Sequence, residues 1–195
     1  MAIIGLKDLH YAIIEEEDEN KTVYGEVKRL GPARAFNIAP TINTADLRAD
    51  DAPLFSDTAK GPATITLNTA YLESEVEADL LGKTVDERGG IVDSGTDDAP
   101  YVAVGGRAED ARGGYQWFWV YRIKFAPSEE NKETKEDTPA YQTPSLTGQA
   151  LPRINDQLER YKLWDGDVED KTIFDEWFDE VVEPEETPEQ ETPEP

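Results

Sequence analysis

A run of alternating side chains at residues 115–125 constrains the fold more than any other feature. Its odd positions all carry large apolar or amphipathic groups: Tyr115, Trp117, Trp119, Tyr121, Ile123 and Phe125. Alternation rich in aromatic and β-branched residues is typical of a strand with one heavily buried face. At about 3.3 Å per residue this strand spans about 36 Å, which is longer than most strands. The pattern therefore predicts a β-protein organised around one long strand.

So long a strand needs a partner, and residues 141–151 follow with polar side chains on one face and Leu146 and Ala150 on the other. We predict that the two segments form a hairpin with a long, charged, projecting loop. An ordinary core hairpin with a flexible tip explains the pattern equally well. The loop contains five acidic and two basic residues and no apolar anchor: Ser128, Glu129, Glu130, Asn131, Lys132, Glu133, Thr134, Lys135, Glu136, Asp137 and Thr138.

The spacing of apolar residues changes to that of a helix at Leu72, Val76 and Leu80, which recur every four residues. Thr69 is the predicted N-cap and Gly82 the predicted C-cap. With about eight predicted strands, this single internal helix indicates a mainly β (α+β) fold, a sandwich or barrel with a helix packed on one flank. Residues 46–60 are polar and predict a loop or a weak edge strand.

Past Pro152 a second helical stripe is predicted over residues 172–182, with Thr172 as its N-cap. This stripe is too apolar to be a free helix, so we expect it to dock against other protein surface: Ile173, Phe174, Trp177, Phe178 and Val181. Residues 183–195 contain six Glu and four Pro and predict a disordered tail. The predicted units are a β domain (1–151), an extension (152–182) and this acidic tail (183–195).

Charge and composition limit the function. The net charge is −24, of which residues 164–195 contribute −13. Proteins that grip nucleic acid use clustered Lys and Arg, so this chain has the wrong sign for gripping and the right sign for a surface that DNA passes without sticking. The chain has no cysteine and neither a membrane-spanning run nor a signal-peptide pattern, which favours synthesis in a reducing cytoplasm.

Catalytic and metal-binding patterns are weak. His10 is the only histidine and lies in a predicted strand, which argues against a His-based hydrolase triad. The acidic residues 165–170 carry their glycine at position two instead of the sixth position of an EF-hand loop, so an acidic turn is the favoured interpretation. We therefore expect no enzyme activity, no cofactor and no metal.

Several segments together resemble the major tail proteins of siphophages, the tail tube subunits of the phi13-type family. The likeness covers residues 5 to about 182, and the acidic tail is a departure from it. It rests on the order and spacing of these segments: Gly5–Ala12, Tyr24–Gly25, Leu80–Gly82, Asp86–Ile91, Ala99–Val104, Lys132–Lys135 and Thr143–Gly148.

The resemblance implies a structural protein of the virion tail, assembled in the host cytoplasm. Six subunits would close one inner barrel that includes the long strand, and rings would stack on a tape-measure protein between tail terminator and tail-tip proteins. The loop Ser128–Thr138 would contact an adjacent ring, and the stripe at 172–182 would dock on the outer wall of the tube or on a neighbouring subunit. DNA would cross the lumen without specific binding, and no membrane would be involved. Two alternatives stay open: a monomeric β-sandwich binding or adhesin module that uses exposed Tyr and Trp, and an enzyme with a carboxylate pair.

Overall fold

Antiparallel strands make up most of the fold. The computed structural model describes residues 2–49, 52–127, 134 and 143–185. The strands are β1 (Ile3–Glu17), β2 (Thr22–Tyr24), β3 (Lys28–Gly31), β4 (Ala33–Ala49), β5 (Ala52–Thr69), β6 (Thr84–Val85), β7 (Ile91–Val92), β8 (Tyr101–Asp110), β9 (Tyr115–Ala126), β10 (Ser145–Ala150) and β11 (Arg160–Trp164). The helices of the described residues are α1 (Ser74–Leu81) and α2 (Thr172–Asp175). The predicted mainly β class is therefore confirmed.

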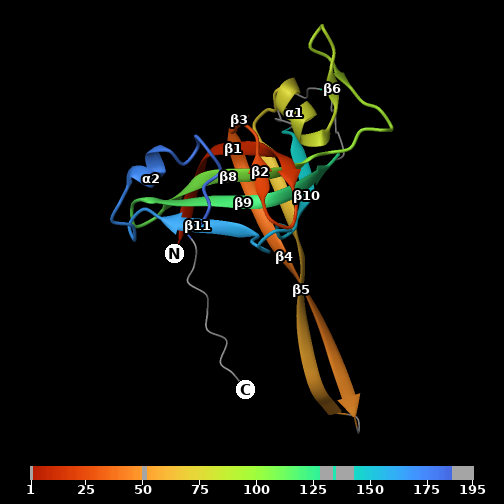
Figure 1. The fold of residues 1–195 in the computed structure, drawn as a ribbon, viewed down its shortest axis with the longest axis vertical. Helices are drawn as coiled ribbons and strands as arrows, with labels where there is room; N and C mark the ends of the chain where they lie inside the picture. The colour runs from red at the N-terminus through yellow and green to blue at the C-terminus, as the bar shows by residue number, and fades with distance from the viewer. Residues whose placement is uncertain (1, 50–51, 128–133, 135–142, 186–195) are drawn as a thin grey trace.

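One curled sheet forms the body, in the order β2-β1-β8-β9-β10-β5-β4, with β3 paired to β1 and β11 paired to β9 (Figure 1). The curl brings the β4–β5–β10 part over the β1–β8–β9 part, and apolar side chains of both parts fill the space between them. This interlayer core includes Leu9 of β1, Leu67 of β5, Val104 of β8 and Phe118 of β9. The predicted pairing of β9 with the segment after it is confirmed, although β10 covers only six residues.

The long strand β9 is buried on both faces, and its predicted alternation breaks in the middle. The register with β8 passes from Val104↔Val120 to Val102↔Ile123, so β9 carries an extra residue there, a β-bulge. Before the bulge the odd positions Trp117, Trp119 and Tyr121 lie in a second apolar cluster outside the sandwich. After it, Ile123 and Phe125 lie in the interlayer core instead. The odd positions therefore do not share one face.

Gly105 of β8 lies directly against the ring of Trp119, which is fully buried. A Cβ atom added at Gly105 would approach the indole to 2.5 Å, and the enclosed ring has no room to move. We expect Gly105→Ala to lower the free energy of unfolding by about 1–3 kcal/mol. Urea denaturation measures this. Gly95→Ala is the matched control, because nothing lies within 4 Å of its added Cβ, and an equal loss in both variants would contradict the prediction.

Helix α1 covers one end of the interlayer core with Val76, Leu80 and Leu81. Gly82 ends it in the left-handed conformation (φ 68°), which confirms the predicted C-cap. The predicted N-cap is wrong, because the helix begins after Glu73, while Thr69 is buried at the end of β5. None of the described helices is long and apolar enough to cross a membrane.

Of the two interpretations of residues 46–60, the edge strand is the one that the structure shows, since β4 lies at the edge of the sheet and pairs with β5 up to Ala49↔Ala52. One further sequence prediction needs correction. The carboxyl-terminal helix spans only Thr172–Asp175, and turns continue the chain to Val181. The helix begins after Lys171, so Thr172 is its first residue and not its N-cap; its amide and hydroxyl bond Asp170 Oδ1 at 3.0 and 2.7 Å.

Candidate functional site

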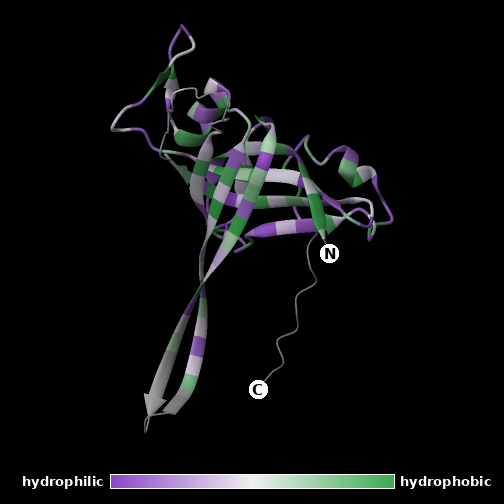
Figure 2. Ribbon diagram, turned by 180° about the vertical axis from the view of Figure 1, so that it is seen from behind, coloured by the Kyte–Doolittle hydropathy of each residue, from purple (hydrophilic) through white to green (hydrophobic). Residues whose placement is uncertain are grey.

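The most prominent feature of the surface is a β-ribbon that projects from the body (Figures 1 and 2). We call residues 41–49 and 52–60 the arm. β10 pairs with β5 only from Ala63 to Asn68, so along the arm β4 and β5 pair with no other strand of the described residues. Nine residues per strand extend it by about 30 Å.

The arm exposes apolar side chains on both faces. Ile42, paired opposite Lys60, is 64% exposed on one face, and Phe55 is 67% exposed on the other. Phe55 and Asp57 alternate with Ser56, so they lie on the same face, and both are exposed. At its base the arm is held to the body by an ion pair between Lys60 and Glu159.

A cavity of about 500 Å³ opens between β4 and the opposite layer of the sandwich, and we call it the mouth. Its apolar lining includes Leu6, Ile38, Phe36 and Phe118, and the rings of Phe36 and Phe118 stack with centroids 5.7 Å apart. Its cationic lining comes from β11, where Arg160 and Lys162 lie two residues apart and therefore on one face.

Neither Arg160 nor Lys162 forms an ion pair with any residue that the structure describes. This is unusual in a chain with 43 acidic and 19 basic residues. Lys162 is exposed, but its partial desolvation, together with the positive charge of Arg160, lowers its pKa. The mouth is thus an apolar cavity bordered by two cations for which the described part of the chain supplies no ion-pair partner.

Beside the mouth-bearing layer, the segment 165–185 packs across the outer face of β9, and we call it the strap. The apolar residues predicted to dock lie here: Trp177 is fully buried, Val181 is buried, and Ile173, Phe174 and Phe178 pack against the same cluster. The Trp177 ring lies 5.8 Å from Trp117 and 6.0 Å from Tyr161, centroid to centroid. The strap therefore covers the aromatic face of its own sheet.

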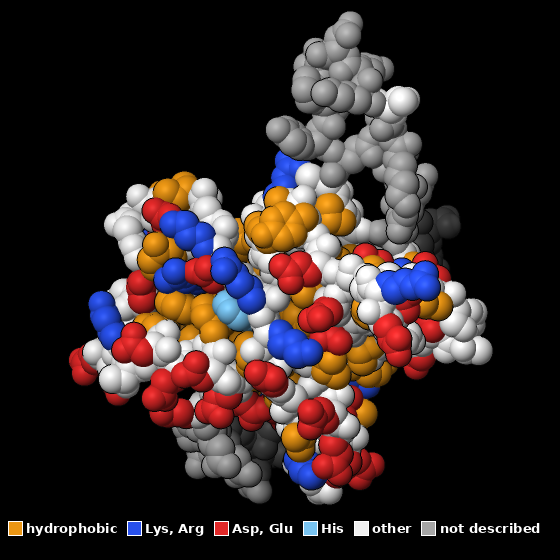
Figure 3. Space-filling view, turned by 90° about the horizontal axis from the view of Figure 1, so that it is seen from above, with side chains coloured by type: hydrophobic (Ala, Val, Ile, Leu, Met, Phe, Trp, Pro, Cys, Tyr) orange, Lys and Arg blue, Asp and Glu red, His pale blue; other side chains and the backbone are white. Residues whose placement is uncertain are grey.

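The strap also touches the lone histidine. His10 stacks on Phe178 with ring centroids 4.1 Å apart, and its Nδ1 lies 3.0 Å from the carbonyl of Asp8. Burial lowers the pKa of His10, so it is neutral at physiological pH. Figure 3 shows basic side chains gathered near this histidine and acidic ones across much of the face. Nearby, Arg107 pairs with Asp8 at 2.6 Å and Lys7 with Glu109 at 2.7 Å.

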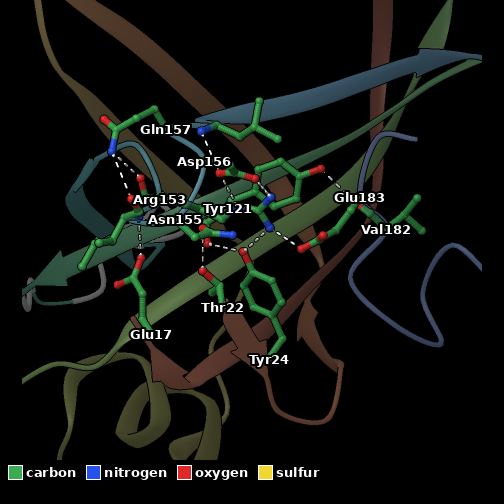
Figure 4. A network of polar contacts seen from close by, with 12 residues as sticks. Glu17, Thr22, Tyr24, Tyr121, Arg153, Asn155, Asp156, Gln157, Val182 and Glu183 are labelled. Atoms are coloured by element: carbon green, nitrogen blue, oxygen red, sulfur yellow. Dashed lines mark hydrogen bonds and ion pairs between the residues drawn. The ribbon is translucent and has the colours of Figure 1, made fainter. Parts of the chain in front are cut away.

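A buried arginine fastens the end of the strap (Figure 4). Arg153 is 1% exposed and forms ion pairs with Asp156 and with Glu183 of the strap. Its guanidinium lies 4.5 Å from the Tyr121 ring centroid, and the Tyr121 hydroxyl donates to the Val182 carbonyl at 2.9 Å. Glu183 therefore belongs to an ordered contact, although the sequence places it in a disordered tail.

Charge and burial shift the pKa values in this network. Burial by itself lowers the pKa of Arg153, but hydrogen bonds to Asp156, Tyr24 and Glu183 outweigh it and raise the value. Burial raises the pKa of Tyr24 to about 12, against the opposing effect of Arg153. The pKa of Asp156 is lowered because its bonds to Arg153 and to the Leu158 amide outweigh burial. The network is therefore a charged, hydrogen-bonded clasp.

The remaining residues singled out in the sequence are those of the charged loop and of the acidic turn. Of the loop Ser128–Thr138, only Thr134 is described, and it is exposed; the predicted ring contact lies outside the described residues. The acidic turn has structural roles, since Asp165 Oδ2 accepts from the Tyr115 amide at 2.8 Å and Asp170 bonds Thr172. Among the described residues no group of three His, Cys, Asp or Glu side chains could hold a metal ion.

Sequence reasoning missed the arm, the mouth and Arg153. The arm lacks a continuous apolar stripe, and its pairing depends on contacts across the hairpin. The mouth brings together β1, β4, β8, β9 and β11, which are distant in the sequence. A single arginine after Pro152 has no local pattern that marks it as buried.

No curated protein matches this sequence. Residues 36–185, from β4 to the end of the strap, match the family described as phage tail tube protein. The match covers the arm, the mouth-lining part of β4, the long strand and the strap, which is well over half of the chain. The chain therefore belongs to the phage tail tube protein family, and is a structural component of the virion tail and not an enzyme.

Proposed function

We propose that copies of this chain close into rings, six to a ring as the resemblance to siphophage tail proteins implies, and that the rings stack into a tube whose lumen DNA crosses. A tape-measure protein would set the tube length, and terminator and tip proteins would bind its ends. The strand β9 would contribute to the shared barrel, and the loop Ser128–Thr138 to contacts between rings. Family membership and two properties of the molecule support this proposal.

The exposed arm is the main observation that supports assembly. A two-stranded ribbon is marginally stable in water unless a further strand or a packed face supports it. The arm has neither in the monomer, and it exposes Ile42 and Phe55. Such a ribbon gains stability when other copies of the chain cover it, as in a ring or tube.

The charge supports passage of DNA. A lumen lined with carboxylates repels phosphate within a Debye length of about 8 Å at physiological salt, so the polyanion would slide without adhering. The net charge of −24 supplies many such groups. The binding-module alternative relies on exposed Tyr and Trp side chains. Trp117, Trp119 and Trp177 are buried, which argues against it, while Tyr71 is 57% exposed.

Negative-stain microscopy with size-exclusion chromatography tests the proposal. We expect rings or tubes with a central pore from the concentrated wild-type chain. A variant in which Asn-Gly replaces residues 43–59 should fold, because Ile42 and Lys60 already face one another as a two-residue turn requires, but it should stay monomeric. A wild-type chain that remains a 21.8 kDa monomer at high concentration would contradict the proposal.

Salt should promote assembly. Acidic copies gathered in a ring repel one another, and raising the ionic strength from about 0.01 to 0.15 M shortens the Debye length from about 30 to 8 Å. We expect the concentration needed for tubes to fall over this range, measured by light scattering. Truncation after Glu185, which keeps the ion pair of Glu183 with Arg153, should ease assembly further at low salt. Tubes that dissolve as salt rises would instead show that attractive ion pairs outweigh the net repulsion.

A further inference from the structure

We propose that the mouth of one copy is the receptor for the arm of a neighbouring copy. The inference rests on the proposed self-assembly, and it adds which two surfaces meet. Phe55 and Asp57 of the arm would enter the mouth, with the ring against the apolar lining and the carboxylate facing Arg160 and Lys162.

The mouth requires an occupant with both an apolar and an acidic part. Its stacked rings of Phe36 and Phe118 offer apolar surface, and β11 adds two cations without an acidic partner among the described residues. In a chain of net charge −24, cations left unpaired beside an apolar cavity favour an acidic, apolar partner.

The arm has this chemistry on a single face. Phe55 is 67% exposed, and Asp57, two residues on, is exposed and forms no ion pair with a described residue. Ala45 pairs opposite Asp57, and Ala59 lies two residues after Asp57 on β5, so both small residues share this face. They leave the Asp57 carboxylate free to enter a cavity beside the exposed Phe55 ring.

The arm projects away from the mouth of its own subunit, so its binding partner is another copy. β4 lines the mouth at residues 35–38 and then carries the arm away, with Leu47 paired opposite Phe55. The nine residues from Ile38 to Leu47 put Phe55 about 30 Å along the ribbon from its own mouth. Contact between two different surfaces is heterologous, and repeated heterologous contacts generate closed rings or open helical filaments. An arm-to-mouth contact therefore builds the kind of assembly that a tube requires.

Charge exchange tests the contact. Arg160→Glu with Lys162→Glu should raise the concentration needed for assembly about tenfold or more, and so should Asp57→Lys. Because all three residues are exposed, thermal unfolding of the subunits should be unchanged. Combining the three substitutions should restore most of the assembly. Restoration would show direct coupling, and additive losses would overturn the proposal.

Cysteine cross-linking identifies the partners independently of tube formation, since the chain has no native cysteine. A chain with Asn37→Cys at the mouth is mixed with a chain of different length with Ala45→Cys on the arm, because Ala45 is exposed and pairs opposite Asp57 on the face that would enter the mouth. Under oxidation we expect a mixed dimer, while Lys171→Cys mixed with Ala45→Cys should give little. If the yield of mixed dimer does not exceed the yield of this control, the proposal is overturned.

The two experiments separate this proposal from the function it rests on. A wild-type chain that forms no tubes would contradict the proposed function, while the cross-link alone would still decide whether arm and mouth meet. The acidic tail is the other candidate occupant of the mouth. If truncation after Glu185 weakens assembly as much as Arg160→Glu with Lys162→Glu, the tail occupies the mouth and the proposal is wrong.

Discussion

Trp177→Ala should lower the free energy of unfolding by about 3–5 kcal/mol. The indole is fully buried and contacts the rings of Trp117, Tyr161 and Phe174 at centroid distances of 5.8, 6.0 and 5.9 Å. Truncation leaves a cavity that these aromatic neighbours cannot fill, because Trp117 and Tyr161 are fixed in strands of the sheet. Urea denaturation of the unassembled subunit measures the loss.

Two variants control this experiment. Trp177→Phe keeps a ring in the site and removes an indole N–H for which the described residues offer no acceptor, so it should cost clearly less than alanine. Ile154→Ala, at a side chain 43% exposed, should change stability by less than about 1 kcal/mol. A loss below about 1 kcal/mol for Trp177→Ala, or fluorescence typical of a solvated indole, would show that the strap is undocked.

The strap shows what the sequence could predict there. The spacing of Phe174, Trp177 and Val181 indicates burial, and these residues do pack against the body. The helical shape was overestimated, because carboxylates at Asp179 and Glu180 oppose the dipole at the carboxyl end of a helix. Side chains on turns can make the aromatic contacts with the sheet as well as side chains on a helix can. Local composition thus indicated burial, while tertiary packing determined the backbone.

The arm and the bulge show where local pattern fails. The arm's residues lack the apolar alternation that marks a half-buried strand, because neither face of a projecting ribbon is covered in the monomer. In β9 the alternation of Trp117, Trp119, Ile123 and Phe125 looks continuous, but one extra residue reverses the faces. A bulge depends on the partner strand β8, which the pattern of β9 alone does not contain. Predicting the arm and the bulge requires knowing which strands pair, and a local sequence pattern does not contain that information.

Arg153→Ala should lower the free energy of unfolding by about 3 kcal/mol, at the low end for a broken buried ion pair. The low end applies because Asp156 and Glu183 are 33% and 49% exposed and stay partly solvated. The variant also loses the contact of the guanidinium with Tyr121. Arg153→Lys keeps the charge but cannot reproduce the forked donors that reach both carboxylates, so it should recover only part of the loss.

Acid should remove this stabilisation in the wild type. The pKa of Asp156 is lowered in the folded protein, so its contribution is present above the unfolded value of about 3.9 and is lost as pH falls through the folded value. We therefore expect Arg153→Ala to cost about 3 kcal/mol at pH 7 and much less near pH 2. Urea denaturation at both pH values measures the difference. An equal loss at both would show that Arg153 stabilises the fold by packing against Tyr121, and that the charges of the clasp contribute little.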